Sequence, residues 1–342
     1  MYDSSHTVRA PESQTGVAVG AHRRPHATLV TVTGSPAKLM LLDTPSLYFR
    51  AFYGVPDSVV APDGSPVNAV RGLLDFIARL VTDRRPTRLV AAMDADWRPA
   101  FRVAAIPSYK AHRVAIEGAE EVPDALSPQV AVIEEVLEAL GVPCFGVEGY
   151  EADDVIGTLA TRDPGPVDVV TGDRDLFQLV DDARSVRILY TARGVGRHDV
   201  VDEAWVAAKY GIPGRSYADF ATLRGDPSDG LPGVAGIGDK TAAALMTRYG
   251  SLSALMAAVD SGDTAMPAGA RAKLAAARDY LAVAPQVVAV AHDVPVPPYA
   301  DLISAAPRDA DRLLTLSTRW GLDSPLNRVL TAFASVTNEP LS

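Results

Sequence analysis

The chain has 342 residues, 48% of them hydrophobic, which is enough for one large globular domain or two smaller ones. A formal net charge of −10 argues against nucleic-acid binding through bulk attraction, and the single cysteine, Cys144, excludes both a disulfide framework and a zinc site made of several cysteines. No apolar run approaches the ~20 residues that a membrane-spanning helix needs, so we expect a cytoplasmic protein with no membrane partner.

The first part of the chain divides into a tail and an α/β region. Residues 1–36 mix charged, proline, glycine and serine residues without helical or strand periodicity, which predicts a disordered tail. Two short apolar runs follow and end in an acid, as buried parallel strands do, and apolar residues at helical spacing predict a helix over 70–81 between them. These runs are 38–43, ending in Asp43, and 87–94, ending in Asp94. Strand, helix and strand in this order are typical of a parallel sheet.

The segment 97–113 interleaves aromatic residues with cations in an otherwise acidic chain. This mixture suits single-stranded nucleic acid, with Tyr109 stacked on a base and the cations on phosphates. The cations are Arg98, Arg102, Lys110 and Arg113. An ordinary solvated helix with arginines lying along its surface explains the same pattern, so both interpretations stay open.

Two further segments continue the α/β pattern. A helix is predicted over 127–140, because Ser127 suits the N-cap and Gly141 suits the position just past the last turn. A third apolar run, 167–173, ends in Asp173. The alternation of strands and helices therefore predicts an α/β fold with a parallel sheet.

More acids gather beside these elements. Glu151, Asp153 and Asp154 stand at the start of a predicted helix, where capping explains one or two of them but not all three. Asp175 follows Asp173 by two residues and could likewise cap a helix.

Ligands of open α/β sheets bind beyond the carboxyl ends of the strands, so we expect the acids at the strand ends to converge. Carboxylates in one cleft cannot all stay ionised without cations, because burial and mutual repulsion protonate some of them. We therefore predict a site for Mg²⁺ or Mn²⁺ that serves phosphate ester chemistry. Asp94 and Asp96 also match phosphatases with a carboxylate nucleophile, but those enzymes need few further acids, so we take Asp96 as a solvated neighbour.

Helical patterns dominate after about residue 211, which predicts an α/β core over 37–211 and a helical region over 212–335. The predicted helices are 204–210, 239–249, 251–259 and 270–281. In the helical region, Asp226 and Asp229 precede a glycine-rich turn that can direct main-chain N–H groups at a phosphate. A plain turn is the alternative, whereas a dinucleotide site is excluded because no strand precedes the glycines.

The segments 151–158, 171–180 and 225–241 resemble the 5′→3′ exonuclease and flap endonuclease family, which includes the 5′-nuclease domain of bacterial DNA polymerase I. The resemblance covers about residues 38–300 and is greatest to stand-alone actinobacterial members, since no polymerase domain follows. It implies a twisted, mostly parallel, PIN-like sheet flanked by helices. It also implies a helical arch at about 99–126 and a helix-three-turn-helix at about 218–255.

The resemblance further implies roles for individual residues. Arg50 and Lys110 would contact the scissile phosphate, Tyr109 would lie near the entering strand, and Asp154 would act in catalysis through water. A K⁺ ion would bind hairpin carbonyls between residues 234 and 237. The metal ligands would be Asp43, Asp94, Glu151, Asp153, Asp173, Asp175, Asp226 and Asp229. The turn residues on duplex phosphates would be Gly236, Gly238, Lys240 and Thr241.

The implied activity is hydrolysis of DNA near junctions of duplex and 5′ single strand, in replication and repair, including Okazaki fragment processing. The implied substrates are flap, 5′-overhang, nicked or gapped DNA and RNA–DNA hybrids, bound by a monomer at the nucleoid. Thr44 and Pro45 follow the first acid where the family has Gly-Ser, and Gly230 follows the last where it has Asn, but every acid is present. The alternatives are a PIN-like ribonuclease, which needs fewer acids and no hairpin, and a non-catalytic DNA-binding module, which would lack acids.

Overall fold

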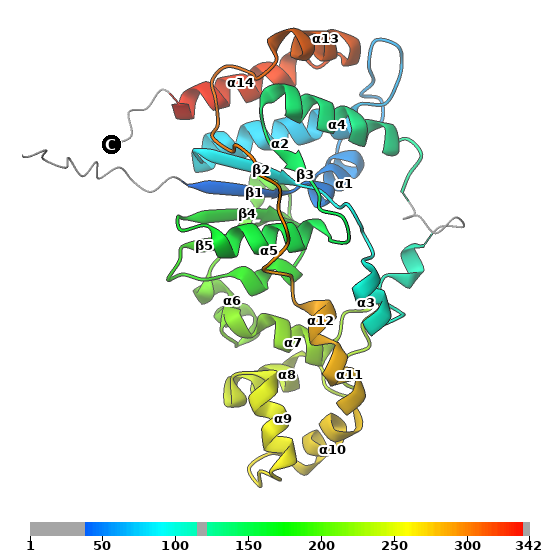
Figure 1. Ribbon diagram of the computed structural model, residues 1–342, viewed down its shortest axis with the longest axis vertical. Helices are drawn as coiled ribbons and strands as arrows, with labels where there is room; N and C mark the ends of the chain where they lie inside the picture. The colour runs from blue at the N-terminus through cyan, green and yellow to red at the C-terminus, as the bar shows by residue number, and fades with distance from the viewer. Residues whose placement is uncertain (1–37, 115–121, 338–342) are drawn as a thin grey trace, which may run out of the picture. The chain divides into compact units, whose positions relative to one another are not determined.

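The computed structural model describes residues 38–114 and 122–337 (Figure 1). The predicted tail, 1–36, and the stretch 115–121 of the predicted arch lie outside the described residues. The strands are β1 (Leu39–Asp43), β2 (Arg88–Ala92), β3 (Cys144–Phe145), β4 (Val167–Thr171), β5 (Val186–Tyr190) and β6 (Asp199–Val201). The α-helices of the first part are α1 (Thr44–Gly54), α2 (Asn68–Arg84), α3 (Ala100–Ala105), α4 (Ser127–Leu140), α5 (Ala152–Arg162) and α6 (Glu203–Tyr210).

The remaining helices are α7 (Tyr217–Arg224), α8 (Asp239–Tyr249), α9 (Leu252–Asp260), α10 (Ala268–Ala276), α11 (Arg278–Val283), α12 (Pro285–Val288), α13 (Ala310–Trp320) and α14 (Asp323–Thr337). Short 3₁₀ helices are η1 (Ala111–Arg113), η2 (Asp175–Leu179), η3 (Val195–Arg197), η4 (Gly214–Ser216) and η5 (Pro227–Asp229).

The described residues form a six-stranded sheet in the order β3-β2-β1-β4-β5-β6. Neighbouring strands are parallel except for the edge pair β5 and β6, which is antiparallel. The predicted mostly parallel sheet is thus confirmed. The chain leaves β1 toward β2 and β3 on one side and returns to β4 and β5 on the other, so the switch in strand order falls between β1 and β4. At such a switch the carboxyl ends of the strands open a crevice for ligands.

Both faces of the sheet are covered, which explains why its central strand reads as an unbroken apolar run. Leu39 and Leu41 of β1 join one core with α5 and the helices α6 to α9, whereas Met40 and Leu42 join the other core. The second core contains residues of α1, α2, α4, α13 and α14. In Figure 1, α2, α4, α13 and α14 accordingly lie on one side of the sheet, and α5 and α6 lie on the other.

Most of the predicted elements appear, with local differences. Ser127 is the first residue of α4 and makes no N-cap hydrogen bond, so its predicted capping role is wrong, whereas Gly141 ends the helix with φ of 86° as expected. The predicted helix over 270–281 is two helices that break at Ala277, whose N–H donates to the carbonyls of both Lys273 and Leu274. The last helices, α13 and α14, pack on α4 and α2 of the α/β core, although we had grouped them with the helical region.

Among the described residues, no single helix is long and apolar enough to cross a bilayer. The consecutive helices α8 and α9 reach that length only together, and they meet at an angle of 84°. Their apolar residues Leu245, Met246 and Leu255 are buried in the core.

Candidate active site

The switch between β1 and β4 places the first two predicted acids together. Asp43 is the last residue of β1 and caps α1 by accepting a hydrogen bond from the backbone N–H of Ser46. The hydroxyl of Thr171, at the end of β4, donates to Asp43 over 2.6 Å and accepts from the backbone N–H of Asp173. Gly172 also donates its N–H to Ser46 Oγ. This network fixes Asp43 and Asp173 at the same edge of the sheet.

The start of α5 adds further acids to this edge. Asp94, just after β2, accepts the backbone N–H of Ala152 over 2.7 Å. Glu151 and Asp154 form a capping box at the start of the helix, so capping explains these two acids and leaves Asp153 without that role. A hollow of about 230 Å³ results, and its charged lining residues are Asp43, Asp94, Glu151, Asp153, Asp173, Lys110 and Arg113. The strand-end acids therefore converge as expected.

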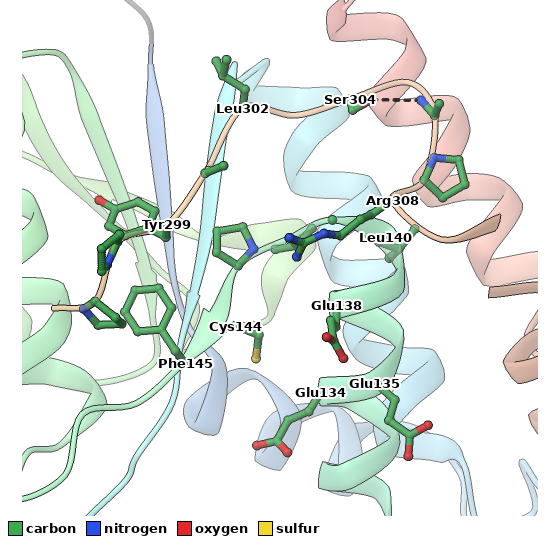
Figure 2. Close-up of a pocket in the computed structure, with 18 of the residues that line it drawn as sticks. Glu134, Glu135, Glu138, Leu140, Cys144, Phe145, Tyr299, Leu302, Ser304 and Arg308 are labelled. Carbon is green, nitrogen blue, oxygen red and sulfur yellow. Dashed lines mark hydrogen bonds between the residues drawn. The ribbon is translucent and has the colours of Figure 1, made fainter. Parts of the chain in front are cut away.

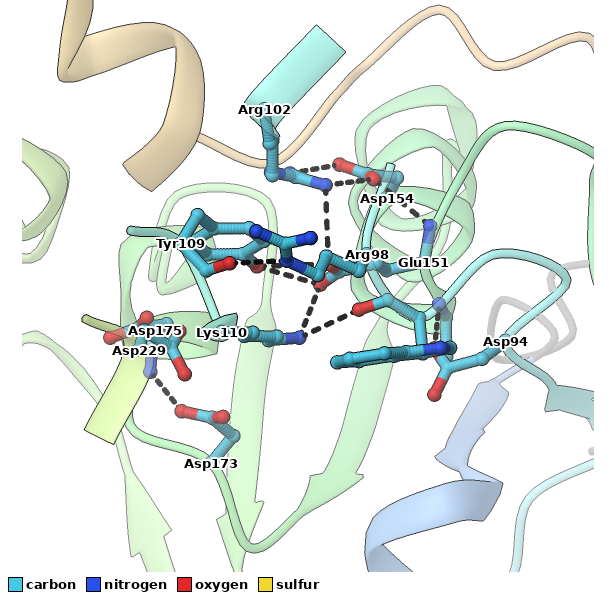
Figure 3. Close-up of polar contacts among 12 residues, drawn as sticks. Asp94, Arg98, Arg102, Tyr109, Lys110, Glu151, Asp154, Asp173, Asp175 and Asp229 are labelled. Carbon is cyan, nitrogen blue, oxygen red and sulfur yellow. Dashed lines mark hydrogen bonds and ion pairs between the residues drawn. The ribbon is translucent and has the colours of Figure 1, made fainter. Parts of the chain in front are cut away.

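A second acidic group lies beside this hollow. Asp175 donates its backbone N–H to the carboxylate of Asp173 over 2.8 Å. Burial raises the pKa of the Asp175 carboxyl group, and repulsion from Asp173, Asp229 and Asp226 raises it further, in that order. Asp226 caps η5 by accepting the N–H of Ser228. Figure 3 shows Asp173, Asp175 and Asp229 side by side.

Close backbone packing joins this second group to the segment after α3. Lys110 donates its N–H to the carbonyl of Asp229 over 2.9 Å, and Ser108 Oγ donates to the carbonyl of Gly230. Gly230 has φ of 71°, and a Cβ atom there would lie 2.2 Å from the carbonyl oxygen of Ser108. Only glycine fits this approach, which explains why Gly230 follows the last acid.

The acids differ in how their charge is balanced. Glu151, Asp226 and Asp229 form ion pairs, with Lys110, with Arg174 and Arg224, and with Arg113, respectively. The remaining acids that we predict as metal ligands form no ion pair with any residue in the described ranges. They are Asp43, Asp94, Asp153, Asp173 and Asp175.

Burial without a counter-ion changes how these carboxyl groups titrate. Burial raises the pKa of Asp43 to about 7, although the hydrogen bond from Thr171 lowers it. Burial also raises the pKa of Asp94, and for Asp153 it acts together with repulsion from Asp43 and Asp173. One carboxylate oxygen of Asp175 is buried and lacks a hydrogen-bond partner in the described chain. Burial therefore disfavours the charged form of these carboxyl groups, and a cation bound beside them would favour it.

The donor set fits a hard divalent cation, because carboxylate oxygens line the hollow and no histidine or cysteine does. The unpaired acids and the orphaned oxygen of Asp175 are what such a cation would satisfy. In the described parts of the chain, no group of three or more Asp, Glu, His or Cys side chains is arranged to hold a metal ion as it stands. Instead, hydrogen bonds from protein groups hold two of the carboxylates: Tyr109 and Lys110 donate to Glu151, and Thr171 and Ser46 donate to Asp43.

Lys110 is the cation most closely tied to the acids. Its ammonium group donates to Glu151 over 2.9 Å, and its backbone lies in the left-handed region at φ of 48°, which is uncommon outside glycine (Figure 3). Burial lowers the pKa of Lys110, but attraction to Glu151 and Asp229 outweighs it and leaves the pKa raised. Lys110 is therefore charged, and it lines the hollow.

Arg50 comes from α1 and reaches the same edge of the sheet. Its guanidinium donates to the carbonyl of Ala192 over 3.5 Å and lies near Gly172. Its Nε atom is buried and has no partner in the described chain. Arg50 thus has unused donors beside the acids.

The structure corrects the predicted role of Arg102 and gives Asp154 a structural partner, whereas catalysis through water by Asp154 stays a prediction. Arg102 is 2% exposed and forms a two-pronged ion pair with Asp154, at 2.6 and 2.7 Å, and it also donates to the carbonyl of Val287. Asp154 is fully buried and also accepts the N–H of Ala291. A guanidinium whose donors are occupied in the core cannot bind a DNA phosphate. The pair of Arg102 and Asp154 instead holds α3, α5 and the end of α12 together.

Tyr109 also differs from the prediction. It is 3% exposed, and its hydroxyl donates to Glu151 over 2.8 Å, so its ring is not available for stacking on a base. Arg98 donates to the carbonyls of Tyr109 and Pro107, and Arg113 pairs with Asp229 while staying partly exposed. Much of the cationic segment 97–113 thus holds the acids in place.

The predicted turn lies directly before α8. Gly236 has φ of 73°, and Gly238 is the N-cap of α8, so backbone N–H groups open onto solvent there. Lys240 and Thr241 are exposed in the first turn of α8. The carbonyl of Gly236 accepts a hydrogen bond from Lys273 over 2.8 Å. K⁺ binding at these carbonyls stays a prediction.

Several residues of the site escaped the sequence analysis. Thr171 donates a hydrogen bond to Asp43, and Ser46 accepts one from the N–H of Gly172. Arg174 and Arg224 both form ion pairs with Asp226. The polar Thr171 at the end of an apolar run was the one available signal. No sequence pattern marks the two arginines, because only the tertiary structure brings them to Asp226.

A larger groove, of about 1180 Å³, lies away from the acids, between α4, β3 and the segment 297–308 (Figure 2). Glu134, Glu135 and Glu138 line one side and Arg308 the other. Cys144 also lies there, and burial raises the pKa of its thiol to about 12, so the thiol is not a nucleophile at neutral pH.

Comparisons with known proteins agree with this geometry. Residues 38–211 match the 5′-3′ exonuclease N-terminal resolvase-like domain, and residues 212–311 match the 5′-3′ exonuclease C-terminal SAM fold. A 5′-3′ exonuclease of Streptomyces coelicolor is 62% identical over 301 residues, which is 86% of this chain and 100% of that protein. A 5′-3′ exonuclease of Mycobacterium tuberculosis is 51% identical over 305 residues, covering 85% and 96% of the two chains.

Solved structures share the fold at low sequence identity. T5 5′-exonuclease with bound zinc ions has a TM-score of 0.56 and 16% identity, covering 88% of this chain and all of that one. Human GEN1 in complex with Holliday junction DNA has a TM-score of 0.56 and 16% identity, covering 89% and 74% of the two chains. With both family domains matched in order and a full-length relative at 62% identity, the chain belongs to the 5′-3′ exonuclease family.

Proposed function

We propose that the protein is a structure-specific 5′ nuclease that hydrolyses DNA phosphodiesters from 5′ ends and near junctions of duplex and 5′ single strand. The observation that carries the proposal is the hollow at the carboxyl ends of β1, β2 and β4, where unpaired carboxylates face Lys110. Family membership supports the same chemistry.

Divalent cations, Mg²⁺ or Mn²⁺, fit the proposal. Asp43, Asp94, Asp153, Asp173 and Asp175 would hold them, with Glu151, Asp226 and Asp229 at the margins. Bound cations of this kind supply a water of lowered pKa and neutralise charge on the phosphate. Structures of T5 5′-exonuclease with metal ions support this assignment.

The protein's own cations would act on the scissile phosphate. Lys110 is charged and partly buried, and it lines the hollow beside Glu151, where it would meet a phosphate oxygen. Arg50 has a buried donor without a partner at the same edge. Donors preorganised where negative charge develops stabilise the transition state more than the bound substrate.

The turn before α8 would hold the duplex. Backbone N–H groups at Gly236 and Gly238 and the side chains of Lys240 and Thr241 would bind phosphates there. Phosphate contacts carry no sequence information, so the enzyme would select DNA by shape, and its affinity would fall with salt.

The substrates proposed are flap, 5′-overhang, nicked and gapped DNA, and RNA–DNA hybrids, consistent with a role in Okazaki fragment processing and repair by a monomer at the nucleoid. Neighbouring folds have been solved with DNA, namely the Rad2 catalytic core with a DNA substrate and human GEN1 with a Holliday junction.

One assay separates this proposal from its alternatives. Purified protein is incubated with Mn²⁺ and with matched flap DNA, the same flap in RNA, and plain duplex, with EDTA as the control. We expect cleavage of the DNA flap near its junction, leaving a 5′ phosphate, and none in EDTA. Cleavage of RNA alone would favour a PIN-like ribonuclease, and binding without cleavage would favour a non-catalytic module.

A further inference from the structure

A second hollow, of about 670 Å³, lies between β5, the β6 end and α6, beside the acids, and shares Arg174 with the active site described above. Its lining combines aromatic rings with cations. The residues that matter are Arg174, Tyr190, Arg193, Trp205, Lys209 and Tyr210, and we call this hollow the base pocket.

The aromatic wall of the base pocket is rigid. Phe177, fully buried in η2, contacts Tyr190, Trp205 and Tyr210, with ring centroids 4.9, 5.4 and 6.3 Å away. Each of these three rings is only half-buried, so it keeps a surface that faces solvent. Rings fixed from behind and open in front bind a flat ligand at little entropic cost.

The cations of the base pocket keep much of their charge available. The Arg193 side chain is 68% exposed and pairs with Asp199, and the Arg174 side chain is 45% exposed and lies 3.5 Å from Asp226. Lys209 is exposed and has no ion-pair partner in the described part of the chain. Positive charge beside open aromatic rings is the combination that suits single-stranded nucleic acid.

The base pocket adjoins the acids of the active site. Arg174 stands between Asp173 and Asp175 in the sequence. Ala192 lines the base pocket, and its carbonyl accepts the hydrogen bond from Arg50. A strand whose scissile phosphate lies on Arg50 is therefore within a short reach of the base pocket.

We propose that the base pocket binds one unpaired nucleotide of the DNA substrate, with its base against Tyr190, Trp205 and Tyr210 and its phosphate on Arg174 and Lys209. A volume of about 670 Å³ lies in the range of small-ligand pockets. This assignment rests on the proposed nuclease function. It adds a contact that recognises an unpaired base next to the cleavage site.

The test uses the full chain and a DNA flap in EDTA, so that nothing is cut. A 4-thiothymidine is placed at each unpaired position in turn, and the photo-crosslinked peptide is mapped. We expect one position to crosslink to Trp205 or Tyr210. At that position, replacing thymine with an abasic site should weaken binding about 5- to 150-fold.

Variants separate a base contact from a folding effect. Trp205→Leu should remove the difference between thymine and the abasic site, and Trp205→Phe should keep most of it. Lys209→Gln should weaken binding of both DNAs, whereas Arg187→Gln, which removes an exposed cation of β5 outside the base pocket, should not. If Trp205→Leu does not fold, the comparison of Lys209→Gln with Arg187→Gln still tests whether the base pocket binds the strand.

Other results would overturn the assignment. Crosslinks that map elsewhere, with equal binding of thymine and abasic DNA, would show that the base pocket takes no strand nucleotide. A change in Trp205 fluorescence on adding dTMP alone, with no crosslink from the flap, would show that the base pocket binds a free nucleotide instead. Failure to cleave any flap in Mn²⁺ would refute the proposed nuclease function, whichever way the crosslinks fall.

Discussion

At the scale of single residues, Asp153 and Asp154 are neighbours with opposite surroundings. Asp154 is paired with Arg102 in the core, whereas Asp153 faces the hollow without a cation. Of these two adjacent carboxylates, Asp154 stabilises the fold and Asp153 is placed for the proposed chemistry.

Asp154→Asn should destabilise the protein by about 3–5 kcal/mol, because it leaves the buried charge of Arg102 without a partner. Urea unfolding followed by circular dichroism measures this change. Asp153→Asn is the matched control. It should leave the metal-free fold at least as stable, since it removes a carboxylate repelled by Asp43 and Asp173, while it lowers the cleavage rate. Equal destabilisation by both variants would contradict this division.

Two lysines should likewise differ in their kinetic effect. Lys110→Met should lower the rate of flap cleavage about 10²- to 10³-fold with little change in DNA affinity, because its charge acts where the transition state develops. Lys240→Met should instead weaken binding and reduce the slope of log affinity against log salt by about 1. Single-turnover kinetics and fluorescence anisotropy measure the two effects. A loss of affinity alone in Lys110→Met would reassign Lys110 to substrate positioning.

At the scale of elements, the active site joins the α/β core to the helical region through the turn at η5. That contact depends on Gly230, whose position admits no side chain next to Ser108. The acids Asp226 and Asp229 stay beside Asp173 only while this packing is intact.

Gly230→Ala should therefore abolish most of the cleavage activity, since its Cβ would clash with a backbone carbonyl and push the turn away from Lys110. Gly262→Ala is the control, because Gly262 has nearly the same φ, 69°, but nothing within 4 Å of the new Cβ. It should cost only about 1 kcal/mol from backbone strain and keep activity. Equal activity of the two variants would show that the contact with Ser108 is dispensable.

At the scale of the whole molecule, the buried acids make stability depend on pH. Burial raises the pKa of both Asp43 and Glu151 to about 7, from 3.8 and 4.5, so between these values the folded state binds more protons than the unfolded state. Their contribution to stability is complete below the unfolded pKa values and is lost as pH rises through about 7.

Without metal, the melting temperature should therefore fall between about pH 4 and pH 7, and Mn²⁺ should raise it most at the higher pH, where the acids are ionised. Differential scanning calorimetry in EDTA and in Mn²⁺ measures both trends. Asp43→Asn should have a shallower pH dependence because it lacks one of the titrating groups. An identical slope in the variant and the wild type would exclude Asp43 as a source of the effect.

The sequence by itself determined the parallel sheet, the acids at the ends of its strands and the glycine turn before α8. These features follow from local rules, since a buried strand needs consecutive apolar residues and a tight turn needs glycine. They located the active site because parallel strands end at one edge of a sheet.

Only the tertiary structure decided which side chains face that site. Arg102 and Asp154 are 52 residues apart in sequence and Tyr109 and Glu151 are 42 apart, so no local pattern could show that these groups satisfy one another in the core. The base pocket likewise needs η2, β5 and α6 to meet around Phe177. Burial and partner choice depend on long-range packing, and that packing separates the acids that stay unpaired from those that hold the fold.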